Sequence, residues 1–160
     1  METKKILITY FSYTGNTRRL AESIREYTGG DLVEIEVLKP YPKDYNTTVA
    51  QGQREVRNGY KPAVKTQIAD IEQYDTIFIG SPIWWFTFAP AVSTFLSKYD
   101  FRAKKIIPFF THGGYGIGSS ISDMQALCPQ AHVLKGWECE GTRIEETKDR
   151  IIAWCKKIVG

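Results

Sequence analysis

Short apolar segments alternate with amphipathic segments along the whole chain. Five short segments of apolar, β-branched or alternating character predict strands. These strands are residues 6–11, 32–37, 76–80, 106–110 and 131–134. Between them, apolar residues that recur at intervals of three and four predict amphipathic helices. These helices are residues 17–27, 88–99, 117–128 and 143–159, with a weaker one inside 45–56.

This alternation predicts one α/β domain over residues 1–160, with a doubly wound parallel sheet of five strands and helices on both faces. The nearly continuous apolar character of the strands agrees, because strands of a parallel sheet are buried on both faces. Ligands of such sheets bind beyond the carboxyl ends of the strands. The loops after the first, third and fourth predicted strands are therefore the candidate site.

The first of these loops is Ser12-Tyr13-Thr14-Gly15-Asn16-Thr17. Its polar side chains surround a turn whose backbone N–H groups lie at a helix N-terminus, which favours an anion. The alternative is an ordinary helix cap, since Ser, Thr and Asn also favour that position. Neither GxxxxGK[ST] nor GxGxxG occurs, so the loop predicts a single terminal phosphate rather than a nucleoside triphosphate or a dinucleotide.

The second loop, Pro82-Ile83-Trp84-Trp85, continues with Phe86. Its consecutive aromatic residues cannot all point into the core from so short a loop. Exposed aromatic side chains at this place predict a flat ligand such as an isoalloxazine ring. We expect one tryptophan to fill the gap between the sheet and a helix, and a tryptophan to contact the ligand.

The third loop begins Thr111-His112-Gly113-Gly114-Tyr115, and glycine fills four of the six positions from 113 to 118. Glycines let the backbone approach the edge of a heterocycle closely. His112 is either a structural residue or a proton donor that titrates near neutral pH.

Composition argues against several classes of protein. The net charge of +3 is small and the Lys and Arg residues are scattered, so no nucleic-acid partner is expected. Three cysteines without a CxxC spacing predict neither a disulfide framework nor a metal site. With no signal peptide and no apolar stretch of membrane-spanning length, we expect a cytoplasmic protein that makes no use of a membrane.

In these three loops the chain resembles the flavodoxin family, and the resemblance runs along its whole length. Residues 12–17 resemble the family's phosphate loop, (Ser/Thr)-x-Thr-Gly-x-Thr. Residues 82–85 and 111–114 resemble the two ring-contacting loops of a bacterial subgroup. The resemblance implies a short-chain form with strand order 2-1-3-4-5 and FMN as cofactor. It also implies that the FMN phosphate is held by Ser12, Thr14, Asn16 and Thr17.

Three features depart from the family pattern. The chain is slightly basic where typical flavodoxins are strongly acidic, so the usual basic redox partner is not expected. His112 stands where the subgroup more often has Ser. Residues 83–89 lack the glycine whose peptide turns over in many members, and positive φ at Trp85 or Phe86 costs about a kcal/mol or more. We therefore predict weaker stabilisation of the neutral one-electron-reduced flavin than in classical members.

The first functional hypothesis is an electron carrier between a reductase and an acceptor enzyme, in which FMN supplies the redox chemistry. The alternative is an FMN-dependent NAD(P)H or quinone oxidoreductase that transfers hydride, which the missing glycine and His112 favour. A phospho-receiver is disfavoured because residues 9–13 contain no acidic side chain, and a hydrolase because no GxSxG occurs. The sequence assigns no role to Tyr41, Tyr45 and Tyr60.

Overall fold

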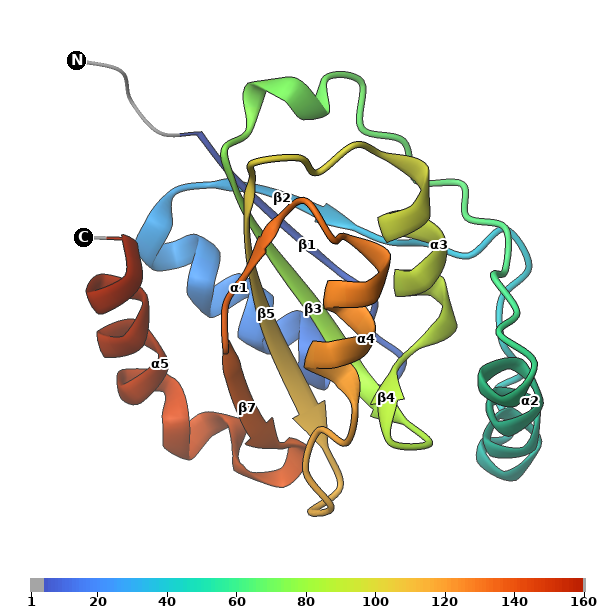
Figure 1. The fold of residues 1–160 in the computed structure, drawn as a ribbon. Helices are drawn as coiled ribbons and strands as arrows, with labels where there is room; N and C mark the ends of the chain where they lie inside the picture. Colours follow the sequence, from blue (N-terminus) through green and yellow to red (C-terminus); the bar gives the residue numbers. More distant parts are fainter. Residues whose placement is uncertain (1–4, 160) are drawn as a thin grey trace.

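The computed structural model describes residues 5–159, so residues 1–4 and 160 of the predicted domain lie outside the described part. Its centre is a twisted parallel sheet (Figure 1). The strands lie in the order β2 (Asp31–Glu34), β1 (Ile6–Tyr10), β3 (Thr76–Trp84), β5 (Lys105–His112) and β6 (His132–Val133). Every neighbouring pair along this path is parallel. The predicted fold class and strand order are confirmed.

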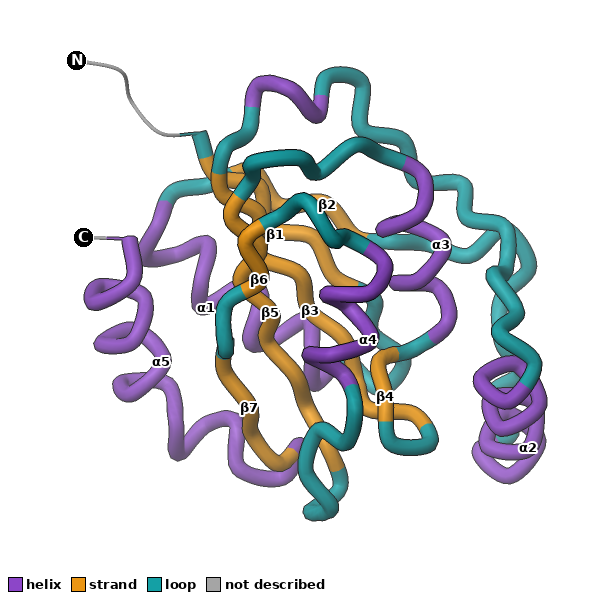
Figure 2. Tube along the Cα trace, viewed as in Figure 1, coloured by secondary structure: helices purple, strands orange, loops and turns teal. Residues whose placement is uncertain are grey.

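Helices cover both faces of the sheet (Figures 1 and 2). α1 (Asn16–Thr28) and α5 (Ile144–Val159) pack on one face, against a core that contains Ile8, Phe78, Ile107 and Phe109. α3 (Pro90–Lys98) and α4 (Ser120–Leu127) pack on the other, against Leu7, Ile77, Ile79, Ile106 and Phe110. Successive strand residues thus point to opposite faces, and because both faces are covered, both sets are apolar.

The outer strand was only partly predicted. Residues 132 and 133 pair with β5 as expected, but the edge continues after a break as β7 (Trp137–Glu140), which also pairs with β5 in parallel. Pro108 of β5 lies opposite the break and has no N–H for the ladder. At the break, Gly136 packs so closely that a Cβ there would lie 2.1 Å from the Pro108 carbonyl oxygen. The edge strand therefore forms in two pieces.

The third strand is longer than predicted. The expected strand ended at residue 80, but β3 runs to Trp84 and turns back as β4 (Thr87–Phe88), which pairs with it antiparallel. The expected loop after the third strand is thus a hairpin that extends past the end of the sheet. Ser81 and Pro82 still pair with β5, whereas Ile83 and Trp84 pair with β4. Apolar periodicity missed the hairpin because its two strands pair with each other beyond the buried sheet.

The weak helix inside 45–56 is confirmed as α2 (Tyr45–Arg57). Asp44 caps its N-terminus by accepting a hydrogen bond from the Thr47 N–H at 2.9 Å. α2 stands apart from the other helices, at the end of the molecule where β3 and β5 finish (Figure 1). Two short 3-10 turns complete the described elements, Ile71–Gln73 and Gly141–Arg143. None of the helices within residues 5–159 has the length and apolar character to cross a membrane.

Candidate functional site

A cleft of about 650 Å³ lies at the carboxyl ends of the strands. All three loops singled out from the sequence contribute to its wall. The predicted site residues that line it are Tyr13, Thr14, Asn16, Pro82, Ile83, Trp84, Trp85, Thr111, His112 and Gly113. The structure therefore brings together three segments that are far apart in the sequence, as expected for the carboxyl edge of a doubly wound sheet.

Two further segments line the cleft and were not predicted. One is a face of α2, and the other is the segment that follows β7. The residues concerned are Tyr45, Thr48, Val49, Gly52, Glu140, Gly141 and Thr142. The α2 residues recur at intervals of three and four, which is a signal present in the sequence. The second segment was missed because β7 itself was not predicted.

The loop before α1 presents unpaired backbone N–H groups. Gly15 adopts a left-handed conformation (φ 98°) at the N-cap, and no side chain caps the helix there. The Ser12 Oγ accepts from the N–H groups of Gly15 (3.1 Å) and Arg18 (3.3 Å). The N–H groups of Thr14, Asn16 and Thr17 have no acceptor among the described residues. A helix N-terminus with free N–H groups is an anion site.

The Thr17 side chain points away from this turn. Its hydroxyl is buried and lies 2.9 Å from the Thr111 hydroxyl at the end of β5. Because the Thr17 hydroxyl faces Thr111, the group of Thr17 that could bind an anion is its backbone N–H. Ser12, Gly15 and Thr17 are thus part of the loop's framework, whereas Thr14 and Asn16 line the cleft.

No Lys or Arg among the described residues lines the cleft. The nearest basic side chain along the chain, Arg18, donates to the carboxylate of Glu34 at 2.7 Å. The one acidic residue of the cleft wall is Glu140. An anion here would be held by backbone N–H groups and hydroxyls, as the hydroxyl-rich loop predicted.

Trp84 is the tryptophan that fills a gap in the core. Its ring makes edge-to-face contacts with Phe11, Tyr13 and Tyr41, at centroid distances of 5.5, 6.0 and 4.9 Å. It also meets α2 at the buried Gly52. This cluster fixes the position of the cleft wall, because edge-to-face aromatic pairs restrict ring orientation.

Tyr41 of this cluster is held by a hydrogen bond to Glu55 of α2. The Tyr41 hydroxyl donates to the Glu55 carboxylate at 2.6 Å. Burial, and then this hydrogen bond, raise the pKa of Tyr41 well above its usual range, so the phenol stays protonated. Tyr41 thus packs the loop before α2, Tyr45 lines the cleft, and Tyr60 is exposed.

Trp85 and Phe86 form the two-residue turn between β3 and β4. Both have positive φ, 53° and 69°, which is the conformation that a tight hairpin turn requires and that glycine or asparagine usually supplies. Trp85 Nε1 donates to the Val49 carbonyl at 3.0 Å, and the Phe86 carbonyl accepts from the Ser119 N–H at 2.8 Å. The positive φ that a turned-over peptide would require here is therefore already present, and the hydrogen bonds to Val49 and Ser119 stabilise this strained turn.

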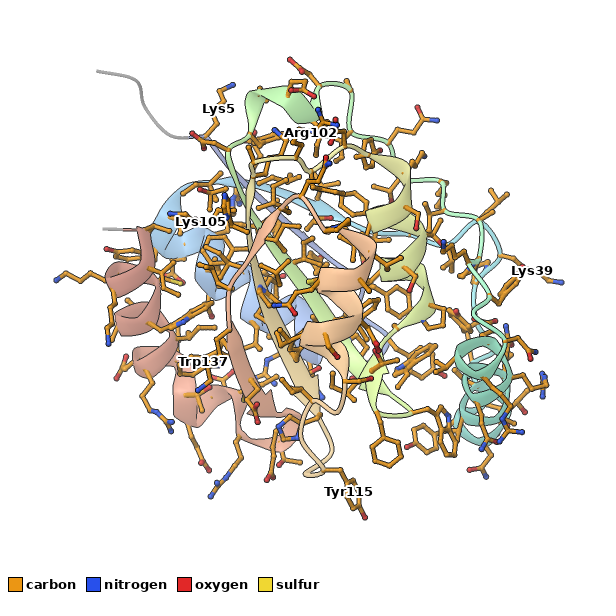
Figure 3. The ribbon with its side chains drawn as sticks, viewed as in Figure 1. Lys5, Lys39, Arg102, Lys105, Tyr115 and Trp137 are labelled. Atoms are coloured by element: carbon orange, nitrogen blue, oxygen red, sulfur yellow. The ribbon has the colours of Figure 1, made fainter. Side chains whose placement is uncertain are left out.

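His112 is engaged through both ring nitrogens. Its Nδ1 accepts from the Gly114 N–H at 3.0 Å, and its Nε2 lies 3.5 Å from a carboxylate oxygen of Glu138. The first contact requires an unprotonated Nδ1, so the neutral ring carries its proton on Nε2, towards Glu138. His112 therefore shapes the glycine-rich loop. At the tip of that loop Tyr115 is 86% exposed and points into solvent (Figure 3).

Comparisons with known proteins agree with this architecture. A family model described as flavodoxin matches residues 5–158. No curated protein matches the chain. Three solved structures with similar folds illustrate the relation. Two carry the provisional description flavoprotein, from Bacteroides uniformis and Bacteroides eggerthii, and the third is a flavoprotein from Lactobacillus acidophilus in complex with FMN.

All three similarities extend over nearly the full length of both chains. The Bacteroides uniformis protein is 30% identical, with a TM-score of 0.85 over 97% of this chain and 99% of that one. The Bacteroides eggerthii protein is 33% identical, with a TM-score of 0.78 over 93% and 98%. The Lactobacillus acidophilus protein is 27% identical, with a TM-score of 0.75 over 90% and 98%. The chain belongs to the flavodoxin family.

Proposed function

We propose that this protein binds FMN non-covalently and carries electrons one at a time between a reductase and an acceptor protein. A phosphate monoester suits one end of the cleft, because the N–H groups of Thr14, Asn16 and Thr17 have no acceptor among the described residues and Thr14 lines the wall. The FMN complex of the Lactobacillus acidophilus flavoprotein, which is 27% identical, supports the assignment of the cofactor.

The residues that line the cleft indicate which part of FMN each segment would contact. Thr14, Asn16 and the backbone at the start of α1 would hold the phosphate, with Ser12 bracing the turn. The hairpin of β3 and β4 and the Gly113 segment would enclose the ring. Bound FMN supplies the redox chemistry, and the protein supplies position and electrostatics.

The engagement of His112 favours a carrier over a hydride-transferring enzyme. General acid catalysis of quinone reduction by a side chain requires a proton donor aimed at the second substrate. His112 is the one histidine in the cleft wall of the described chain, and its nitrogens face Gly114 and Glu138. An electron carrier needs no such donor, because only electrons leave through the edge of the ring.

The test compares one-electron and two-electron acceptors. The FMN-loaded protein is reduced without oxygen and mixed with cytochrome c, and its oxidation is followed by absorption. Carriage predicts that each FMN reduces two cytochromes, and that NADH or NADPH with a quinone gives no turnover. Catalytic oxidation of NADH or NADPH would instead establish the alternative, an FMN-dependent oxidoreductase.

A further inference from the structure

The segment from residue 36 to 66 leaves the sheet edge and returns to it. Its two ends are joined by hydrogen bonds from the Leu38 N–H to the Ala63 carbonyl (2.8 Å) and from the Lys65 N–H to the Glu36 carbonyl (2.9 Å). We call this segment the α2 excursion, because α2 forms its outer part (Figure 1). It is a distinct projection beside the cleft.

The α2 excursion carries the entire net charge of the protein. It contains six Lys and Arg residues against three Asp and Glu residues, whereas the rest of the chain has fifteen of each. The overall charge of +3 is therefore not spread over the surface, as the sequence suggested, but belongs to one projection. Fields of this kind steer charged partners.

Five of these basic side chains are exposed and form no ion pair among the described residues. They are Lys39, Lys43, Arg54, Arg57 and Lys61. Lys39 extends outward from the molecule in Figure 3. Elsewhere, Arg18, Arg19, Arg143 and Lys148 each have a carboxylate partner, and the fifteen basic residues outside the excursion are balanced by fifteen acidic ones. The positive charge of the excursion is thus available to another molecule.

The acidic residues of the excursion do not neutralise this face. Glu55 is buried and accepts from the Tyr41 hydroxyl (2.6 Å) and the Gln51 amide (2.8 Å). Glu36 lies 4.0 Å from Lys65, and Asp44 is used as the cap of α2. All three serve the internal structure of the excursion.

The basic side chains of α2 lie on its far side from the cleft. Tyr45 and Gly52 line the cleft, and Arg54 follows Tyr45 by nine positions, which is two and a half helical turns. Tyr60, which is 55% exposed, follows the C-terminal end of the helix. Tyr and Arg are enriched among the residues that dominate binding energy at protein interfaces.

We propose that the outer face of the α2 excursion docks an acidic surface of a redox partner protein. This inference rests on the proposed function, since a carrier must dock with the proteins that load and unload it. Contact there places the partner against the outside of the cleft wall that α2 forms with Trp84 and Trp85. Complementary charge sets the rate and orientation of such encounters.

The test uses the FMN-loaded protein and cytochrome b5 as an acidic probe, with binding followed by NMR chemical shifts at two ionic strengths. The double variant Arg54→Glu/Arg57→Glu should weaken binding about tenfold or more at low salt. Lys156→Glu/Lys157→Glu on α5 makes the same change of charge on the opposite side and should change binding less than about threefold. Binding of the unaltered protein should weaken as salt rises.

Several outcomes would overturn the docking surface. These are no binding of cytochrome b5, equal losses in the two double variants, and equally tight binding of a random single-stranded DNA. The proposed function fails separately, because binding needs no electron transfer. If charge-dependent binding persists while no electrons pass to any cytochrome, the docking surface stands and the carrier function does not.

Discussion

The hydroxyl oxygens of Thr17 and Thr111 lie 2.9 Å apart in the protein interior. Thr17 lies in the first turn of α1 and Thr111 is the last residue but one of β5, so this contact joins the loop before α1 to the glycine-rich loop. Both side chains are almost fully buried, at 1% and 4% exposed, and neither hydroxyl can turn to water. The two loops that would hold the two ends of FMN are therefore coupled directly.

Replacing both partners of this pair should cost less than the sum of the two single replacements. Thr111→Val leaves the buried Thr17 hydroxyl without its partner and should lower the free energy of unfolding by about 1–3 kcal/mol. Thr17→Val/Thr111→Val removes both hydroxyls and should cost less than the two single changes together. Urea denaturation of the four proteins gives the coupling energy. Strictly additive losses would show that the hydroxyls do not interact.

Gly15→Ala should weaken FMN binding more than it weakens folding. The space around Gly15 is open, so the cost lies in its φ of 98°, which an L-residue adopts at a penalty of about 1–2 kcal/mol. Gly29→Ala is the matched control, because Gly29 ends the same helix with φ 71° and equally open surroundings. Both variants should lose similar stability, and only Gly15→Ala should reduce the preference for FMN over riboflavin. An equal loss of that preference in both would contradict the phosphate assignment.

Phe86→Asn should stabilise the protein. Phe86 has a φ of 69° and is 61% exposed, so asparagine relieves strain while little apolar burial is lost. The gain in unfolding free energy should be about 1 kcal/mol, measured by urea denaturation. Ala103→Asn, at another exposed position with positive φ (62°), should give a similar gain. If Phe86→Asn destabilises the protein while Ala103→Asn does not, the aromatic ring contributes more than its exposure indicates.

His112 should be replaceable by asparagine but not by alanine. Asparagine offers a carbonyl oxygen to the Gly114 N–H that Nδ1 accepts from in the native protein. His112→Ala should weaken FMN binding by about fivefold, equivalent to one hydrogen bond of about 1 kcal/mol, and His112→Asn by less than about twofold. Fluorescence quenching of FMN measures both. If His112 instead acts as a proton donor, both variants should change the pH dependence of flavin reduction to the same extent, because neither alanine nor asparagine can replace the imidazole.

The thiols of Cys128 and Cys155 should resist alkylation in the folded protein. Burial raises the pKa of Cys128 to about 11 and that of Cys155 to about 12. At pH 8 fewer than about one thiol in a thousand is then ionised. Mass spectrometry after iodoacetamide treatment should find these cysteines unmodified at pH 8 and modified after unfolding in urea.

The raised pKa values of Cys128 and Cys155 also determine how the free energy of unfolding changes at alkaline pH. Because the folded thiols keep their protons to higher pH than the unfolded ones, the free energy of unfolding should fall as pH rises above about 9. Urea denaturation between pH 8 and pH 10.5 measures the slope. A rise in stability over this range would contradict the burial of the two thiols.

The sequence was sufficient for the parts of the fold that follow apolar periodicity. The core strands, the strand order and α5 were predicted, and so were the three segments that meet at the cleft. The strand order came from the resemblance to the flavodoxin family. The others depend on a local pattern together with one rule, that the carboxyl ends of parallel strands share an edge.

The parts that escaped prediction depend on contacts distant in sequence. The break before β7 depends on Pro108 facing Gly136, and the contribution of α2 to the cleft depends on Trp85 bonding to Val49. The buried position of the Thr17 hydroxyl depends on Thr111, which lies 94 positions away. None of these pairings leaves a periodic trace in the chain, so only the folded structure reveals them.

The two-piece outer strand has a consequence for how copies of this protein behave at high concentration. An uninterrupted strand at the rim of a sheet exposes a continuous row of N–H and C=O groups on which another chain can add. Here the rim consists of His132–Val133 and Trp137–Glu140, each too short to template a ladder, with Gly136 turned out of line between them at φ 80°. Pro108 of β5, which faces the break at Gly136, thereby protects this edge of the sheet against edge-to-edge aggregation.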